Sequence, residues 1–267
     1  MSNGPPKGNE LPGLRGGALL QPGESLGTPS SGNGHARPRN YILAQMSDAQ
    51  SASIAKSLVP VELPLGLSLS LPHEEIEYLY FPTSGLISTD ALTESGDSIE
   101  VSLIGREGFA GVFGLLGHSQ MAHSVIMQGA GFGYRIRMSL FREEFLKGGP
   151  LLQLVHSFLY MQMTQMTQSV LCNRLHAVEA RLARWLLASA DRMESEELQL
   201  TQEFLAQMLG SRRSTVTVAA GSLQRAGFID YTRGRIHLVN RAGLESAACE
   251  CYRIVRATYD RLLPKNF

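Results

Sequence analysis

The stretch LTQEFLAQMLGSRRSTVT, residues 200–217, decides how the C-terminal part of this chain is organised. Thr201 is a good helix N-cap, and Glu203 in the first turn complements the helix dipole. Gly210 stands where the end of a helix needs a positive φ, and Ser211 can cap a second helix. The buried face of that second helix is apolar: Val216, Ala220 and Leu223. A helix, a short turn that contains glycine and a second helix form the helix-turn-helix pattern.

Arginines at the start of the second helix indicate what this motif binds. Arg212 and Arg213 fall in its first turn, where each exposed cation opposes the helix dipole by roughly 0.3–1 kcal/mol. This cost makes sense if the helix end meets an anion, as a recognition helix does in the major groove of DNA. Arginine pairs with guanine, and hydroxyls contact bases or phosphate. The expected base-reading side chains are Arg213, Ser214 and Thr217. Those expected at phosphates beside them are Ser211, Arg212 and Thr215.

A β-hairpin is expected directly after the second helix. Residues 229–232 and 236–239 have the composition of two short strands. The tip between them carries Arg233 and Arg235 around a glycine, which suits a wing that lies along phosphates. A solvated turn is the alternative, and the adjacent helix-turn-helix favours the wing.

The charges of the 267-residue chain sum to zero, from 24 Lys and Arg against 24 Asp and Glu, but they are unevenly distributed. Residues 41–173 carry 6 basic and 12 acidic side chains, whereas residues 174–267 carry 14 basic and 10 acidic. Within residues 201–241, six arginines stand against two acidic side chains. The acidic part should repel a duplex and help confine DNA contact to the basic part.

Composition and periodicity divide the chain into four segments. The first 40 residues hold 9 of the 27 Gly, 6 of the 12 Pro and no aromatic residue, which predicts a disordered tail, or one with a short interaction motif. Short strands separated by turns follow, which indicates a β-roll or barrel. The predicted segments are the tail (1–40), a β-roll sensor domain (41–148), a long helix (149–173) and a winged helix-turn-helix domain (174–267).

The β-roll is expected to begin with a short helical stretch over 41–58. Alternating leucines then predict one half-buried strand over 61–71. The further predicted strands lie at 76–81, 86–92, 98–104, 124–127 and 132–136.

Apolar side chains of the long helix recur at about 3.5-residue spacing. Such a stripe can bury against its own domain or against a twin helix. The length of the helix, and the glutamines beside its methionines, favour a seam between two chains. The predicted dimerisation residues are Leu151, Leu154, Val155, Phe158, Met161 and Met166.

Several classes of protein are not expected from this sequence. No apolar run approaches the roughly 18 residues that span a bilayer, and the N-terminus lacks the apolar core of a signal peptide. We therefore expect a cytoplasmic protein with no membrane partner. No nucleophile with a base, no phosphate loop and no metal-ligand cluster is evident, so no enzyme and no metal site are predicted. Cys249 and Cys251 fall in a helix expected over 243–263 with no companion histidine cluster, and Cys251 is assigned to the core.

With these residues in place, the chain resembles the Crp–Fnr family of transcription regulators over about residues 41–263. The resemblance implies an α+β fold with an N-terminal double-stranded β-helix or jelly roll of the cyclic-nucleotide-binding type, a long dimerisation helix and a winged helix-turn-helix. It also implies that Thr201 and Gln202 contact phosphate and that Arg213 reads guanine.

Two positions depart from the cyclic-AMP receptor protein of that family. Ser214 stands where that protein has a glutamate, and Val218 where it has a second base-reading arginine. The docking mode is expected to carry over, whereas the operator sequence is left open.

The sensor departs further from the cyclic-AMP-binding members, in which a glutamate holds the ribose and an arginine the cyclic phosphate. Val112 stands at the glutamate position, and His123 and Ser124 lie where arginine and its neighbour would be. No Lys or Arg occurs between Arg106 and Arg135, so a buried cyclic phosphate would be poorly compensated. Cyclic AMP is therefore not expected in the usual mode, and His123 is better interpreted as a loop residue. The candidate effector pocket is Glu107, Val112, His123 and Ser124.

No cofactor is predicted. An iron–sulfur sensor needs four thiolates and the chain has three cysteines, while haem ligation by His or Cys stays open without support from the spacing. We predict a homodimeric, sequence-specific DNA-binding transcription regulator of a palindromic double-stranded operator. RNA polymerase and an unknown small-molecule effector are further expected partners. The alternative is a ligand-binding signalling module whose helix-turn-helix serves protein contacts rather than DNA.

Overall fold

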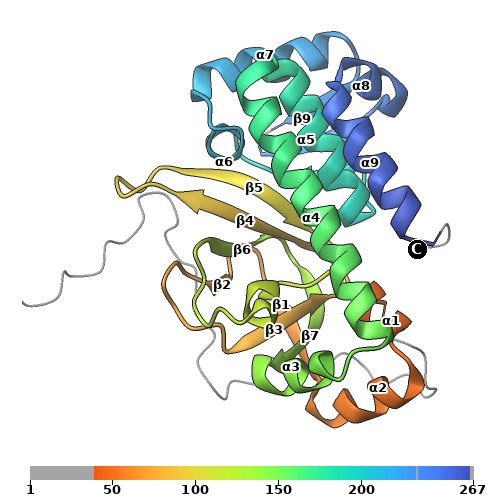
Figure 1. Ribbon diagram of the computed structural model, residues 1–267. Coiled ribbons are helices and arrows are strands. Elements are labelled where there is room, and N and C mark those ends of the chain that lie inside the picture. The colour runs from red at the N-terminus through yellow and green to blue at the C-terminus, as the bar shows by residue number, and fades with distance from the viewer. Residues whose placement is uncertain (1–38, 233, 265–267) are drawn as a thin grey trace, which may run out of the picture.

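The computed structural model describes residues 39–232 and 234–264. Two bodies are joined by the long helix α4 (Pro150–Leu175), which runs along the side of a strand-rich body and on into a helical one (Figure 1). The predicted tail, residues 1–40, lies outside the described residues except for Arg39 and Asn40. Within the described residues, no helix is both long and apolar enough to cross a membrane.

The strand-rich body is a roll of two antiparallel sheets. The first sheet has the order β1-β7-β3 and the second β2-β6-β4-β5. The strands of the first sheet are β1 (Val59–Leu63), β7 (Gly131–Arg137) and β3 (Tyr78–Pro82). Those of the second are β2 (Ser68–Ser70), β6 (Ser124–Gly129), β4 (Leu86–Leu92) and β5 (Ser98–Ile104). This arrangement confirms the predicted jelly-roll type of fold.

Short helices surround the roll. They are α1 (Tyr41–Gln45), α2 (Asp48–Ile54), η1 (Ala55–Ser57), η2 (Val112–Leu116) and α3 (Met138–Leu146). The single strand expected over 61–71 is wrong, because the chain turns at Gly66, whose φ is +81°. Helix α3 was not predicted at all, since its apolar side chains continue directly from β7.

The core of the roll fixes the lower half of α4. The rings of Phe81 and Phe109 stack with centroids 4.8 Å apart, and Phe158 of α4 lies 5.2 Å from Phe109. A Cβ at Gly108 would lie 1.9 Å from the Phe158 ring, so only glycine allows this approach. The other α4 side chains fully buried in the same core are Leu151, Val155 and Met161.

This packing corrects the prediction for the dimer seam. Leu151, Val155, Phe158 and Met161 are 0% exposed within their own chain and cannot face a partner. Leu154 is half-buried against the same core, and Met166 is half-buried. Of the glutamines that suggested a seam, Gln162 and Gln165 are buried and Gln168 is half-buried. Gln165 Oε1 accepts hydrogen bonds from Arg192 at 2.8 Å and from the Tyr259 hydroxyl at 3.1 Å. The apolar stripe of α4 is therefore buried in the core of its own chain and does not form a surface for a second chain.

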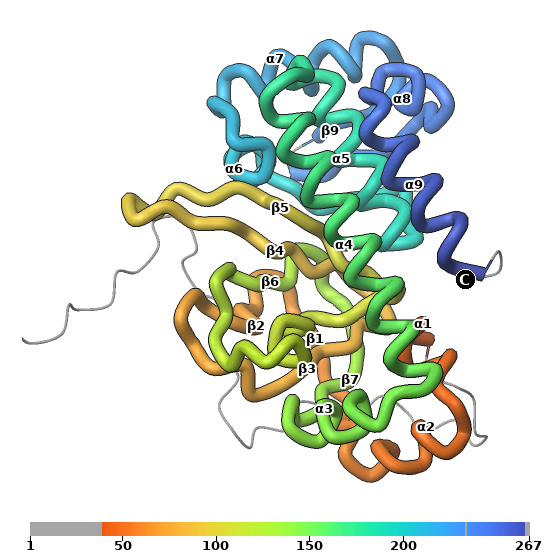
Figure 2. Tube along the Cα trace, in the orientation of Figure 1, coloured from red at the N-terminus to blue at the C-terminus, as the bar shows by residue number. Residues whose placement is uncertain are grey.

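The helical body contains a small three-stranded sheet of order β8-β10-β9. Its core surrounds Trp185, which is 1% exposed. The elements are α5 (Val178–Met193), β8 (Glu197–Gln199), α6 (Gln202–Met208), α7 (Arg213–Arg225), β9 (Ile229–Thr232), β10 (Arg235–Leu238), α8 (Arg241–Ala247) and α9 (Glu250–Leu262). The tube in Figure 2 shows α9 returning beside α4 and α5.

The helix expected over 243–263 is two helices. Ala248 and Cys249 are extended, with ψ angles of 148° and 161°, and they separate α8 from α9. Leu244 is buried in the core around Trp185, whereas Val255 and Tyr259 pack against α4 in the core of the roll. One straight helix cannot serve both cores.

A buried carboxyl connects the two bodies. Both carboxylate oxygens of Glu100, on β5, lie 3.0 Å from the indole nitrogen of Trp185 on α5. Gln128 donates a third hydrogen bond at 3.2 Å. Burial and the neighbouring Asp90 carboxyl raise the pKa of Glu100 to about 7, and burial raises the pKa of Asp90 to about 6.

We expect the stability of the chain to fall as the pH rises from about 4.5 to about 7 because of Glu100. The folded chain keeps this proton up to about pH 7, whereas an unfolded chain releases it near 4.5. Glu100→Gln retains an acceptor for Trp185 but carries no charge. It should raise the free energy of unfolding at pH 8 by on the order of 2 kcal/mol and change it little at pH 4.

Urea unfolding at a series of pH values measures this difference. Glu94→Gln, at an exposed turn, controls for the loss of a surface carboxyl. A Glu100→Gln chain that is less stable than the wild type at pH 8 would show that the buried carboxylate is stabilising.

Candidate nucleic-acid interface

The turn between α6 and α7 has the predicted conformation where α6 ends, but the residue that precedes α7 differs from the predicted cap. Thr201 caps α6, its hydroxyl accepting from the Phe204 amide at 3.1 Å. Gly210 has a φ of +53° and ends the helix. Ser211 does not cap α7, because its amide donates to Ala206 at 2.9 Å and the N-cap is Arg212, one residue later. No side chain caps α7, so its first amides are free to meet a ligand.

The outward face of α7 carries the predicted base-reading side chains. Arg213, Ser214 and Thr217 are all exposed, as are Thr215 and Val218. Thr217 also lies 2.9 Å from Gln202 Oε1, which places the first residue of α6 beside the recognition face. The inward face is buried in the core around Trp185: Val216, Ala219, Ala220 and Leu223.

Unpaired arginines gather at this end of the helical body. Arg212, Arg213 and Arg235 are exposed and form no ion pair with a carboxylate in the part of the chain that the structure describes. By contrast, Arg192 pairs with Glu107 at 3.1 Å, and Arg256 pairs with Asp191 at 3.1 Å. Cations left without partners beside open helix amides are suited to bind phosphate.

The hairpin after α7 is the predicted wing. β9 and β10 pair with Thr232 opposite Arg235 and Tyr231 opposite Ile236. Gly234, with a φ of +84°, makes the turn, and its carbonyl accepts from the Leu200 amide at 2.7 Å. The tip is therefore fixed to the start of the helix-turn-helix. Arg233 lies outside the described residues.

The space between the roll and α4 is a small apolar cavity. Its volume is about 50 Å³, and its lining includes Val112, Phe113 and Met163 but no Lys or Arg. A cavity of this size is too small for a nucleotide, and a phosphate in it would have no cationic partner.

The other candidate effector residues lie elsewhere in the roll. Glu107 is buried, with its carboxylate bound by Arg192 of α5 at 3.1 Å and by the Gly105 amide at 3.0 Å. His123 stacks on Phe113 with centroids 5.7 Å apart, and burial lowers its pKa, which favours a neutral ring. Ser124 is buried in β6 opposite Asp90. Glu107 thus bridges the roll to α5, and of the four candidates Val112 alone lines the cavity.

Comparison with known proteins agrees with this geometry. Residues 180–247, from α5 to α8, match the family described as the Crp-like helix-turn-helix domain. The chain carries a Crp-like helix-turn-helix domain. No curated protein matches its sequence. Solved structures of the Crp/Fnr family share its fold, which confirms the resemblance seen in the sequence.

Three of these structures illustrate the likeness. A Crp/Fnr-family transcriptional regulator from Eubacterium rectale has a TM-score of 0.62 at 18% identity, over 76% of this chain and 94% of its own. The c-di-GMP responsive global regulator CLP of Xanthomonas campestris has a TM-score of 0.61 at 16% identity, over 72% and 99%. A Crp/Fnr regulator from Thermus thermophilus has a TM-score of 0.58 at 23% identity, over 71% and 98%.

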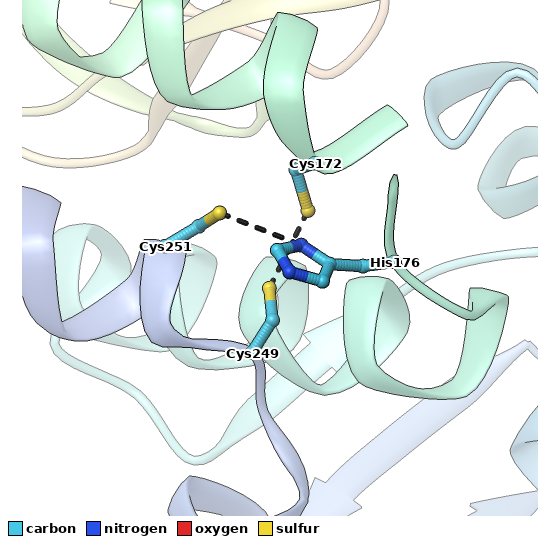
Figure 3. A group of neighbouring side chains, drawn as sticks. All are labelled: Cys172, His176, Cys249 and Cys251. Carbon is cyan, nitrogen blue, oxygen red and sulfur yellow. Dashed lines mark hydrogen bonds between the residues drawn. The ribbon is translucent and has the colours of Figure 1, made fainter. Parts of the chain in front are cut away.

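The structure also assembles a group that the sequence analysis missed. Cys172, His176, Cys249 and Cys251 meet where α4 ends and α9 begins (Figure 3). The statement that Cys249 and Cys251 have no companion histidine is wrong. The signal was present as Cys-x-x-x-His on one helix and Cys-x-Cys further on, but 72 residues of sequence separate His176 from the next cysteine.

Cyclic AMP should leave the thermal stability of the chain unchanged. The cavity is small and apolar, and its lining offers no cation to the phosphate. A ligand at a hundredfold excess over its Kd raises the free energy of unfolding by about 2.7 kcal/mol, which would shift the melting temperature by several degrees. Differential scanning fluorimetry at about 1 mM cyclic AMP therefore distinguishes the two cases, and a shift of that size would contradict the assignment.

Proposed function

We propose that this chain is a sequence-specific DNA-binding transcription regulator that works as a homodimer on a palindromic operator. The observation that carries the proposal is the set of exposed, unpaired arginines at the uncapped start of α7, within a Crp-like helix-turn-helix domain. Two α7 helices in successive major grooves would be about 34–36 Å apart.

Each part of the interface has a separate task in this proposal. Arg213 at the first position of α7 pairs with a guanine, and Ser214 and Thr217 contact the neighbouring bases. Thr201, Gln202, Ser211, Arg212 and Thr215 contact phosphates around the groove. Arg233 and Arg235 on the wing hold the adjacent backbone. Because phosphate contacts do not carry sequence information, the two groups should respond differently to mutation.

A second face of α4 supports the homodimer. Met163 and Val170 are 66% and 72% exposed. With Tyr160, Thr167 and Arg174 they are spaced alternately by three and four residues, which is the spacing of a two-stranded coiled coil. We therefore assign the seam to this face instead of the buried one.

RNA polymerase and a small-molecule effector remain proposed partners. The cavity between the roll and α4 has a volume of about 50 Å³, which favours a small apolar effector there, or none. A signalling module that uses its helix-turn-helix only for protein contacts is the second candidate. The arginines at α7 and the wing argue against it, since a protein partner would need acidic groups at each of them.

Mutations should separate base reading from phosphate binding. Operators are first identified by selecting genomic duplexes that the purified chain retains. Arg213→Ala should cost about 1–3 kcal/mol of operator binding and relax specificity at one base pair. Arg233→Ala and Arg235→Ala should weaken binding to every duplex and reduce the salt slope by about 1 each.

Fluorescence anisotropy over a range of salt concentrations gives both the binding affinity and its salt slope. Lys56→Ala removes an exposed cation from the strand-rich body and is the control. Unchanged affinity in all three arginine variants would contradict the DNA-binding proposal and favour the signalling module.

Charges on the outer face of α4 should separate the dimer. Met163→Asp combined with Val170→Asp changes two exposed side chains of each chain and places four carboxylates in the seam. We expect sedimentation equilibrium to give a dimer for the wild type and a monomer for this variant. Leu146→Asp, at a 61% exposed position of α3, is the control. A wild-type monomer, or a variant that stays dimeric, would contradict the seam.

A further inference from the structure

Four potential metal ligands converge at the joint between the long helix and the helical body. Cys172 is in the last turn of α4, and His176 is the residue that ends this helix, its amide donating to the Cys172 carbonyl at 3.2 Å. Cys249 immediately precedes α9 and Cys251 lies in its first turn. Their Sγ and ring nitrogen atoms all lie within 4.8 Å of one another. In Figure 3 the imidazole points into the space among the three sulfurs.

Two of the distances between these atoms are close to those of a tetrahedral site. Cys172 Sγ lies 3.4 Å from Cys249 Sγ, and Cys251 Sγ lies 3.6 Å from His176 Nδ1. Zinc–sulfur bonds of about 2.3 Å and zinc–nitrogen bonds of about 2.0–2.1 Å, arranged tetrahedrally, place ligand atoms roughly 3.5–3.8 Å apart. The three thiols are buried, so a metal held by them is shielded from water.

The orientation of the histidine is set from outside the cluster. His176 Nε2 lies 3.2 Å from the Glu250 carboxylate. A carboxylate that accepts the proton of one ring nitrogen leaves the other nitrogen free as a ligand, and this is the usual second partner of a zinc-binding histidine. Cysteines that merely fill a core would not need it.

The local backbone gives a further reason to assign a ligand role. Cys249 occupies the N-cap of α9 but makes no side-chain cap hydrogen bond. Ser, Thr, Asp or Asn is preferred at that position because each caps the helix. The thiol instead faces the other two sulfurs and the imidazole.

The charge balance around the cluster fits a dication. Arg184 is buried and makes no ion pair with a carboxylate in the described part of the chain. Its positive charge acts on Cys172 and Cys251 and also on the buried Glu100 carboxyl. Three thiolates and one Zn²⁺ leave one net negative charge, which this guanidinium opposes. The neighbouring Arg181 interacts with Cys172 and Cys249 in the same way.

We propose that Cys172, His176, Cys249 and Cys251 bind one Zn²⁺ ion in a closed structural site. Thiolate and imidazole ligands in a tetrahedron select zinc, and four protein ligands leave no open position for catalysis. On binding, three S–H bonds release their protons to water and three Zn–S bonds and one Zn–N bond form, with no change of oxidation state.

The metal would fix the DNA-binding body to the long helix. His176 and Ala177 are the residues between α4 and α5, and α7 packs on α5. Joining the end of α4 to the start of α9 across this connection limits its rotation. The site is thus placed to make the position of the recognition helix depend on zinc.

Metal analysis of the full-length chain tests the proposal. The chain purified under reducing conditions should retain one Zn²⁺ per chain, as measured by inductively coupled plasma mass spectrometry. After chelation, added Co²⁺ should give the visible bands of tetrahedral cobalt bound by thiolate, and added Zn²⁺ should remove them. The cysteines are buried, so variants at the histidine and the carboxylate are the safer probes of each contact.

His176→Ala should lose the cobalt bands, whereas His118→Ala, at an exposed loop histidine, should keep them. Glu250→Gln should lower the affinity for zinc about 10–100-fold, as measured by competition with a chelator. Glu245→Gln makes the same chemical change on α8 and should have no effect. Each variant's circular dichroism spectrum confirms that it is folded.

Three results would overturn the proposal. The first is a reduced wild-type chain that binds neither Zn²⁺ nor Co²⁺. The second is a disulfide between Cys172 and Cys249 in the chain purified without reductant, together with no zinc binding after its reduction. The third is iron with acid-labile sulfide in place of zinc. None of these measurements involves DNA, so their failure is distinguishable from failure of the proposed function.

Discussion

The contact between Phe158 and Gly108 is the constraint on which the rest of the structure depends. The ring lies so close to the Gly108 backbone that no other residue fits there, and it stacks into the aromatic group around Phe109. This contact fixes the lower half of α4 to the roll. The direction of the upper half of α4 is thereby set, and α9 packs along it. Helix α5 is tied to it by the hydrogen bond from Arg192 to Gln165. Because α7 packs on α5, the position of α7 is set from the core of the roll.

The same packing explains what the sequence could and could not predict. The strands at 86–92 and 98–104 and the hairpin around Gly234 are confirmed, because alternation and turn residues are local signals. The residues predicted for a dimer seam lie on the buried face of α4, because an apolar stripe does not reveal which surface covers it. Gln165 looked like a seam residue, yet its partners Arg192 and Tyr259 come from helices far along the chain.

The candidate sites show the same division. Arg213, Ser214 and Thr217 follow from one short motif, and the structure places all three on the exposed face of α7. The cysteine and histidine cluster depends on the chain returning to the end of α4 after four further helices, α5 to α8, and a small sheet. Only tertiary packing brings His176 to Cys251. The break at Ala248 is equally non-local, because it results from two cores that compete for one stretch of chain.

Helix α5 is held by polar contacts whose strength depends on pH and, if the proposed site is filled, on zinc. Trp185 binds a carboxyl whose pKa is near neutrality, and Arg192 joins Glu107 of the roll to Gln165 of α4. The proposed zinc ligands flank the connection at the other end of the helix. Apolar packing alone would hold α5 whatever the pH or the metal supply. Suppose that α5 has two positions and that a proton or a metal ion binds more tightly in one of them. Binding then shifts the equilibrium toward that position by the difference between the two binding free energies. Because α7 is packed on α5, such a shift reaches the DNA-binding face without any ligand in the roll.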